Sequence, residues 1–107
     1  MSSMIKIAVD AMGGDNSPRK IIDGVIHHYS SNKEVFYKIF GDENKINEIL
    51  DNKINSKNFE IVNTLNKVSN EDSPLEGAKR GKDTSMWLAV ESVKKKDCDI
   101  VISAGNT

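Results

Sequence analysis

Two aspartates flank a paired glycine directly after an apolar run near the start of the chain. The stretch reads IKIAVDAMGGDNSP at residues 5–18, with Asp10 ending the apolar run and Asp15 ending the turn. The glycines permit positive φ and let another group approach the backbone closely. A helix that begins at Pro18 presents unpaired backbone amides, and such amides bind anions. The stretch therefore predicts phosphate chemistry.

Two later stretches place small polar residues beside a helix signal and a strand signal. KDTSM at residues 82–86 precedes a helical pattern, and SAGNT at residues 103–107 follows an apolar run. Hydroxyls, glycine-turn amides and a cation are groups that position and stabilise an oxyanion. The candidate catalytic residues are Asp10, Lys82 and Asn106, and the candidate substrate- or phosphate-binding residues are Gly13, Gly14, Asp15, Asp83, Ser85, Ser103, Gly105 and Thr107. No metal cluster is implied.

Each of these residues also has an ordinary structural role. A glycine pair followed by aspartate is a common tight turn that often binds nothing. Asp10 and Asp15 can serve only to cap backbone amides, and Lys82 can be a solvated surface side chain. GAKRGKDT at residues 77–84 approaches a P-loop pattern. Its glycine spacing is one residue short and Asp83 interrupts the GK followed by Ser or Thr, so we reject that motif.

Cys98 is the one cysteine of the chain. A single cysteine excludes an internal disulfide and fits a reducing, cytosolic compartment. Because Cys98 precedes the last apolar run, we expect it at the amino edge of a parallel sheet, opposite the glycine turns. A structural thiol is then favoured over a nucleophile.

Apolar runs alternate with helical patterns along the chain. Strands are predicted at residues 5–10, 35–40, 59–62 and 99–103. Helices are predicted over 18–29, from about Glu43 with Ile46, Ile49, Leu50 and Ile54 inward, over 74–79, and from about Ser85 with a buried stripe of Met86, Ala89, Val90 and Val93. This alternation is typical of an α/β fold with a doubly wound, mainly parallel sheet and helices on both faces.

The fold class predicts where the candidate residues meet. In such a sheet ligands bind beyond the carboxyl ends of the strands, where the winding reverses. The first and fourth strands both end in the polar stretches described above, and the helix from Ser85 begins at the same edge. We therefore expect Gly13 and Gly105 at one edge. The other candidates expected there are Asp10, Gly14 and Asp15 after the first strand, Ser103, Asn106 and Thr107 after the fourth, and Lys82 and Asp83 at the start of the helix.

The composition describes an ordinary soluble chain. It has 107 residues, 29% charged and 37% hydrophobic, and a formal net charge of -1. The absence of a basic excess argues against a nucleic-acid partner. The sequence stops at a glycine turn directly after a strand, so we expect residues 1–107 to be the N-terminal part of a single α/β domain.

DAMGGD, KDTSM and SAGNT together resemble the PlsX family of phosphate acyltransferases. The GDE at residues 41–43 and the spacing between the blocks fit that family as well. The resemblance covers the whole chain but only the N-terminal part of the family's length. One departure is Thr84, where the family usually has serine, and the hydroxyl is kept.

The resemblance implies transfer of a fatty acyl group from acyl carrier protein to inorganic phosphate, which gives an acyl phosphate for phospholipid synthesis. It implies a fold similar to that of isocitrate dehydrogenase and phosphotransacetylase. It further implies a cytosolic homodimer that can associate peripherally with the membrane, without a metal or organic cofactor. Under this reading, residues 105–107 supply amides for phosphate or for an oxyanion, and Lys82 neutralises charge.

Two other interpretations stay open. One is a different phosphate- or nucleotide-binding α/β domain, although a haloacid-dehalogenase-type phosphatase would need aspartate at Met12. The other is a non-catalytic, truncated remnant of the acyltransferase. We expect the isolated 107-residue chain to be marginally folded and inactive, because a short chain buries a smaller share of its surface.

Overall fold

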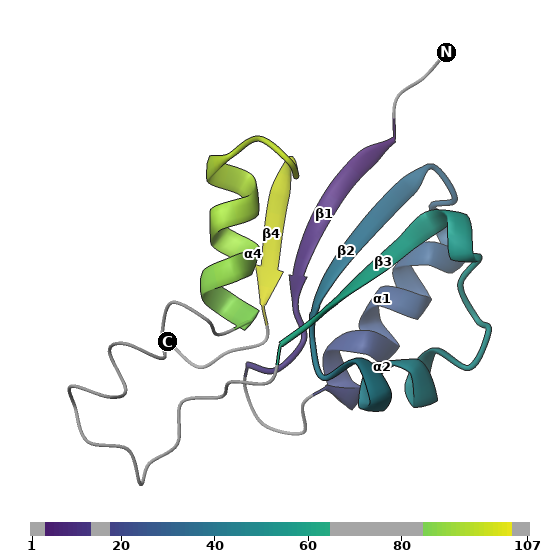
Figure 1. Cartoon of the computed structure of the whole chain (residues 1–107). Coiled ribbons are helices and arrows are strands. Elements are labelled where there is room, and N and C mark those ends of the chain that lie inside the picture. The colour runs from purple at the N-terminus through teal and green to yellow at the C-terminus, as the bar shows by residue number, and fades with distance from the viewer. Residues whose placement is uncertain (1–3, 14–17, 65–84, 104–107) are drawn as a thin grey trace, which may run out of the picture.

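The computed structural model describes residues 4–13, 18–64 and 85–103 (Figure 1). These residues form a parallel sheet with helices packed on it. The strands are β1 (Ile5–Asp10), β2 (Val35–Gly41), β3 (Phe59–Asn63) and β4 (Ile100–Ser103). The helices are α1 (Arg19–Ser31), α2 (Glu43–Leu50), the short 3-10 helix η1 (Ser56–Asn58) and α4 (Ser85–Lys94). The helix predicted over 74–79 lies outside the described residues.

The strands run parallel in the order β3-β2-β1-β4. The chain therefore moves outward from β1 to β3, then crosses the sheet and adds β4 on the other side of β1. Right-handed crossovers in opposite directions put helices on opposite faces. Figure 1 shows α1 and α2 together beside β2 and β3, and α4 beside β4. The predicted doubly wound arrangement is confirmed, and the winding reverses at β1.

Successive residues of β1 face the two layers of helices. Ile7 and Val9 belong to the cluster formed with α1 and α2, whereas Ala8 belongs to a separate cluster with residues of α4. Ala8 and Val9 are fully buried. A strand segment covered on both faces is expected to be apolar at every position, which explains the three apolar residues at positions 7–9. Ile5 and Lys6, at the start of the strand, are exposed.

Helix α2 forms as the sequence predicts. The Asp42 side chain caps it by accepting hydrogen bonds from the backbone N–H groups of Asn44 and Lys45. Its inward residues are buried, namely Ile46, Ile49, Leu50 and, just beyond the helix, Ile54. The following loop contains η1, which was not predicted.

The structure corrects the predicted buried stripe of helix α4. Its buried residues are Ser85, Ala89 and Ser92, whereas Met86 and Val90 are exposed. Ala89 packs in one cluster with Ala8, Phe40 and Cys98 of the sheet side, and Leu88 and Val93 flank that cluster. Small side chains let a helix pack closely on a sheet. The buried face of α4 therefore follows the size of its side chains and cannot be read from their hydrophobicity alone.

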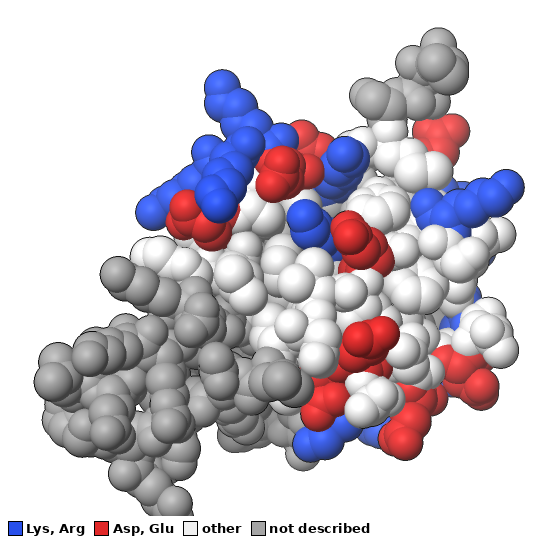
Figure 2. All heavy atoms as spheres, viewed as in Figure 1, with Lys and Arg blue, Asp and Glu red and all other residues white. Residues whose placement is uncertain are grey.

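Charged side chains of both signs lie on the face that Figure 2 shows, around a central area of uncharged residues. Figure 2 shows Lys and Arg interspersed with Asp and Glu over the viewed face. Lys94, Lys95 and Lys96, at and just after the end of α4, are all exposed. Among the helices of residues 4–13, 18–64 and 85–103, none has the length and apolar character needed to cross a membrane.

Tyr37 is buried in the middle of β2 and points toward α1. Its hydroxyl lies 2.5 Å from Nδ1 of His28, and the two rings meet edge to face. Burial raises the pKa of Tyr37 to about 12, and the nearby Tyr29 adds to this effect.

We expect Tyr37 to make the folded chain less stable as pH rises from about 10 to about 12. The unfolded chain loses this proton near the ordinary pKa of 10.0, whereas the folded chain holds it to about 12, so alkali favours unfolding within this window. The ultraviolet absorbance of tyrosinate in a pH titration measures the ionisation of the tyrosines in the folded chain. Tyr37→Phe should remove the component that titrates at the highest pH. An unchanged titration curve in that variant would contradict the assignment.

Candidate functional site

Asp10 ends β1 at the centre of the carboxyl edge of the sheet. It pairs in register with Phe40 of β2 on one side and Ser103 of β4 on the other. Only 1% of its surface is exposed. Because the winding reverses at β1, this edge is the position at which doubly wound sheets bind ligands.

The Asp10 carboxylate joins the ends of three elements. Its Oδ1 accepts hydrogen bonds from the Ser85 hydroxyl, which opens α4, and from the Met12 backbone N–H at 3.2 Å. Its Oδ2 accepts a hydrogen bond from the Ser103 hydroxyl at 2.7 Å. Hydrogen bonds to a carboxylate are stronger than neutral ones. We call Asp10, Ser85 and Ser103 the aspartate–serine cluster.

The structure thus brings together one residue from each of the three polar stretches. Gly13 lies half-buried in the loop after β1, at the same edge. The remaining candidates lie outside the described residues, namely Gly14, Asp15, Lys82, Asp83, Gly105, Asn106 and Thr107. Of the two glycines expected to share this edge, Gly13 lies there, and Gly105 lies outside the described residues. The expectation that the two share an edge therefore stays a prediction.

The loop after β1 is held by the end of β2. The Ala11 N–H donates to the Phe40 carbonyl at 3.0 Å, and the Asp42 N–H lies 3.5 Å from the Met12 sulfur. Gly41 leaves room for this loop, since an added Cβ would come within 2.9 Å of Ile46 Cδ1 and 3.1 Å of the side chains of Ala11 and Met12. The glycine of the GDE block therefore serves the position of the loop beside Asp10.

The cluster is fully hydrogen-bonded and its donors are neutral. In the described part of the chain, every buried side-chain nitrogen or oxygen has a hydrogen-bond partner. The same part contains no group of three or more His, Cys, Asp or Glu residues placed to hold a metal ion. The geometry fixes the first strand, the start of α4 and the end of β4 relative to one another, and it orients two hydroxyls.

Cys98 lies away from this cluster. It is 4% exposed and packs with Ala8, Phe40 and Ala89. It precedes β4, whose opposite end is Ser103, so the prediction of an amino-edge position is confirmed. The thiol is a core side chain.

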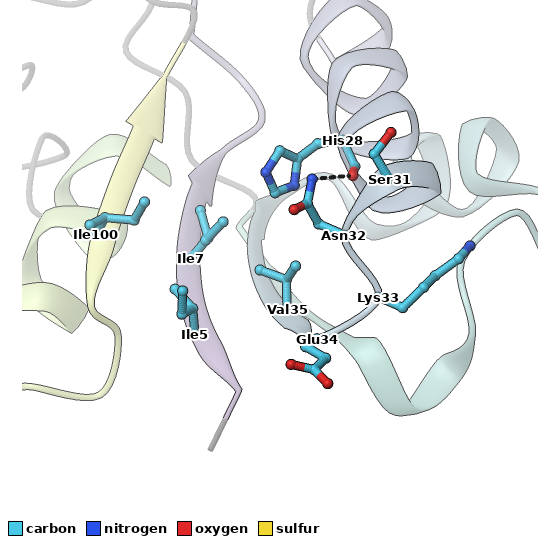
Figure 3. A pocket seen from close by; sticks show the side chains of 9 residues that line it. All are labelled: Ile5, Ile7, His28, Ser31, Asn32, Lys33, Glu34, Val35 and Ile100. Atoms are coloured by element: carbon cyan, nitrogen blue, oxygen red, sulfur yellow. Dashed lines mark hydrogen bonds between the residues drawn. The ribbon is translucent and has the colours of Figure 1, made fainter. Parts of the chain in front are cut away.

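Sequence reasoning missed two hollows on the α1 side of the sheet. One, of about 530 Å³, lies at the amino edge between β1 and the end of α1 (Figure 3), where the Asn32 side chain donates to the His28 carbonyl at 3.1 Å. The other, of about 440 Å³, is largely apolar and lies between α1 and β4. Ile100 and Ile102, which line it, are 48% and 36% exposed. The alternation of Ile100 and Ile102 in β4 is the sequence feature that could have indicated the second hollow.

Comparison with known proteins gives a consistent result. The family model described as "Fatty acid synthesis protein" matches residues 5–107. The phosphate acyltransferase of Pelagibacter ubique is 65% identical over 107 residues, which are 100% of this chain and 32% of that protein. The phosphate acyltransferase of Listeria monocytogenes serotype 4a is 47% identical over 103 residues, 96% of this chain and 30% of the relative. That of Streptococcus uberis is 41% identical over 104 residues, 97% of this chain and 30% of the relative. The chain thus spans about a third of the length of these relatives.

Proposed function

Since the chain belongs to the family of fatty acid synthesis proteins, we propose that residues 1–107 act as the N-terminal part of a phosphate acyltransferase domain. The proposed reaction transfers a fatty acyl group from acyl carrier protein to inorganic phosphate and yields an acyl phosphate for phospholipid synthesis. The observation that carries the proposal is the meeting of β1, α4 and β4 at Asp10, at the edge where a doubly wound sheet binds its ligands.

The reaction needs positioning more than it needs a strong base. A phosphate oxygen attacks the thioester carbonyl carbon and forms a C–O bond. The C–S bond then breaks, and the thiolate of the carrier leaves and takes a proton from water. Holding the two reactants together supplies up to about 7–11 kcal/mol in favourable cases. Each good donor to the oxyanion of the intermediate adds about 3–4 kcal/mol.

The described residues contribute a rigid frame to this reaction. Helix α4 begins at Ser85, so the positive end of its dipole lies beside the Asp10 cluster and favours an anion there. In the proposal, Lys82 neutralises charge and residues 105–107 supply amides. We further propose that the complete enzyme is a cytosolic homodimer that associates peripherally with the membrane.

The test is a chimera in which this chain replaces the matching N-terminal third of the Pelagibacter ubique relative. Acyl phosphate is measured from acyl carrier protein thioester and inorganic phosphate. We expect the chimera to be active and the 107-residue chain alone to be inactive. A folded chimera without activity would overturn the proposed reaction, and phosphate binding without transfer would favour a different phosphate-binding domain. Comparable activity of the short chain would overturn its role as part of a larger domain.

Cys98→Ser is the control variant of this experiment. The thiol is buried at the opposite edge from Asp10, so we expect turnover in the chimera to stay nearly unchanged. A loss of several orders of magnitude with the fold intact would show that the thiol takes part in the reaction.

A further inference from the structure

The apolar face of the sheet under α1 extends one strand farther than α1 covers it. Ile100 and Ile102 of β4 pair in register with Ile7 and Val9 of β1, so the four side chains lie on the same face. Figure 3 shows Ile7 and Ile100 beside each other on their two strands. Ile7 and Val9 are buried, whereas Ile100 and Ile102 are exposed. Parallel sheets are normally covered on both faces, so this part of β4 is a surface that another element can cover.

Gly24 is an independent sign that another element packs here. It lies in the middle of α1 and lines the apolar hollow together with Ile100 and Ile102. Glycine is the least favourable residue in a helix after proline. In the described part of the chain no atom lies within 4 Å of a Cβ added at Gly24, so no contact there requires a glycine. A glycine on a helix lets a second backbone approach closely, and the hollow beside it leaves the space for one.

The relatives are long enough to supply this element. The matched phosphate acyltransferases are about three times as long as this chain. The direction of winding restricts which part of the remaining length can reach the hollow. The step from β3 to β4 puts α4 on the face opposite α1, and a right-handed crossover that continued outward from β4 would put its helix on that same face. The α1 face of β4 is then left for a segment that comes later.

We propose that the hollow between α1 and β4 is the docking site of a helix from the C-terminal two thirds of the complete protein. The helix packs beside α1 over Ile100 and Ile102 and comes closest at Gly24, and it follows the first connection after β4. The inference rests on the proposed function in one respect, namely that residues 1–107 are the N-terminal part of a larger domain. It does not depend on the reaction.

Ile102→Cys in the chimera, with Cys98→Ser as background, measures the cover directly. Maleimide labelling of the new thiol is followed by mass spectrometry of its peptide. We expect labelling to be at least about tenfold slower than that of Ser30→Cys, because the docked helix must open before the reagent enters. Ser30 is the matched control, since it is exposed on α1 and lines neither hollow. Equal labelling rates in a folded chimera would overturn the proposal.

A photo-crosslink identifies the covering element. Lys20 is exposed at the rim of the apolar hollow, so Lys20→Cys can carry a benzophenone maleimide. After irradiation we expect a product with the mass of one chain, whose linked peptide lies more than about 30 residues beyond Thr107, the length of one strand–helix–strand unit. A covalent dimer would show that a second copy covers the hollow. That result, a linked peptide in the first connection, or no linked peptide beyond Thr107 would contradict the proposal.

Gly24→Ala tests the close approach at α1. In the chimera the added methyl group should overpack the interface and lower the melting midpoint by about 2 °C or more, although helix propensity alone would raise it. Ser30→Ala adds an alanine to the exposed side of the same helix, where the serine hydroxyl donates only to the His27 carbonyl, and should not lower the midpoint as much. A higher midpoint in Gly24→Ala would overturn the proposed contact.

These measurements need a folded chimera but no catalysis, so they separate the inference from the proposed function. An active chimera in which Ile102→Cys and Ser30→Cys label equally fast overturns the inference alone. A folded but inactive chimera with a protected thiol and the expected linked peptide supports the inference and overturns the proposed reaction. Protection of Ile102→Cys that appears only after addition of acyl carrier protein thioester would indicate a ligand site and would overturn the docked helix.

Discussion

Asp10→Ala should lower the free energy of unfolding of the chain by about 3 kcal/mol, a large share of the about 5–15 kcal/mol of a typical domain. The variant removes the acceptor of three hydrogen bonds. Water can replace it at exposed Ser103, but the buried Ser85 hydroxyl would lose its partner. The cost therefore arises mainly at the start of α4 and in the loop at Met12.

Asp42→Ala is the matched control for this prediction. It removes the same carboxylate from a half-buried capping position, where the side chain accepts from the N–H groups of Asn44 and Lys45. Loss of a cap costs about 1 kcal/mol. Urea unfolding followed by far-ultraviolet circular dichroism compares the two variants. Equal losses would mean that Asp10 is only another cap.

Gly41→Ala should destabilise the chain by about 1–3 kcal/mol, the usual cost of overpacking. The new methyl group would lie 2.9 Å from Ile46 Cδ1, which can shift, but also 3.1 Å from Ala11 Cβ, which moves only with its backbone. The loop after β1 would have to give way. In the chimera we therefore expect phosphate binding to weaken as well.

Gly24→Ala makes the same chemical change where there is space. No atom lies within 4 Å of a Cβ added at this position of α1, and alanine is the better helix former. This variant should gain up to about 1 kcal/mol. The same unfolding measurement checks both glycines, and a destabilisation of similar size in both would exclude crowding as the cause at Gly41.

The sequence was sufficient to predict which strand and helix ends meet at the carboxyl edge of the sheet. Apolar runs marked the strands, and their alternation with helices placed the ends of β1 and β4 together. The carboxylate–hydroxyl bonds of Asp10 were not predicted, because they depend on side-chain directions that a pattern does not contain. The same reason applies to the His28–Tyr37 contact, which needs the packing of α1 on β2.

Helix α4 shows where a pattern based on hydrophobicity fails. Met86 and Val90 are the more apolar residues, yet Ala89 with two serines faces the sheet. Close packing against Ala8 and Phe40 selects small side chains. A stripe of apolar residues indicates which side chains gain most from leaving water. It does not indicate how closely the backbones of the helix and the sheet must approach each other.

The pairing of β1 with β4 also orders events in time. The Ser103–Asp10 bond spans 93 positions of the chain, whereas β2 and β3 follow β1 much sooner. Closing so long a loop costs more entropy than closing a short one, and contacts distant in sequence slow folding. During synthesis, β1, β2 and β3 can pair before Ser85 and Ser103 have been made. At that stage β1 is an edge strand, and Asp10 lacks both serine partners. The cluster is then the last part of this sheet to form, and interruption of translation before β4 leaves a partial sheet whose central aspartate has neither serine bound in place.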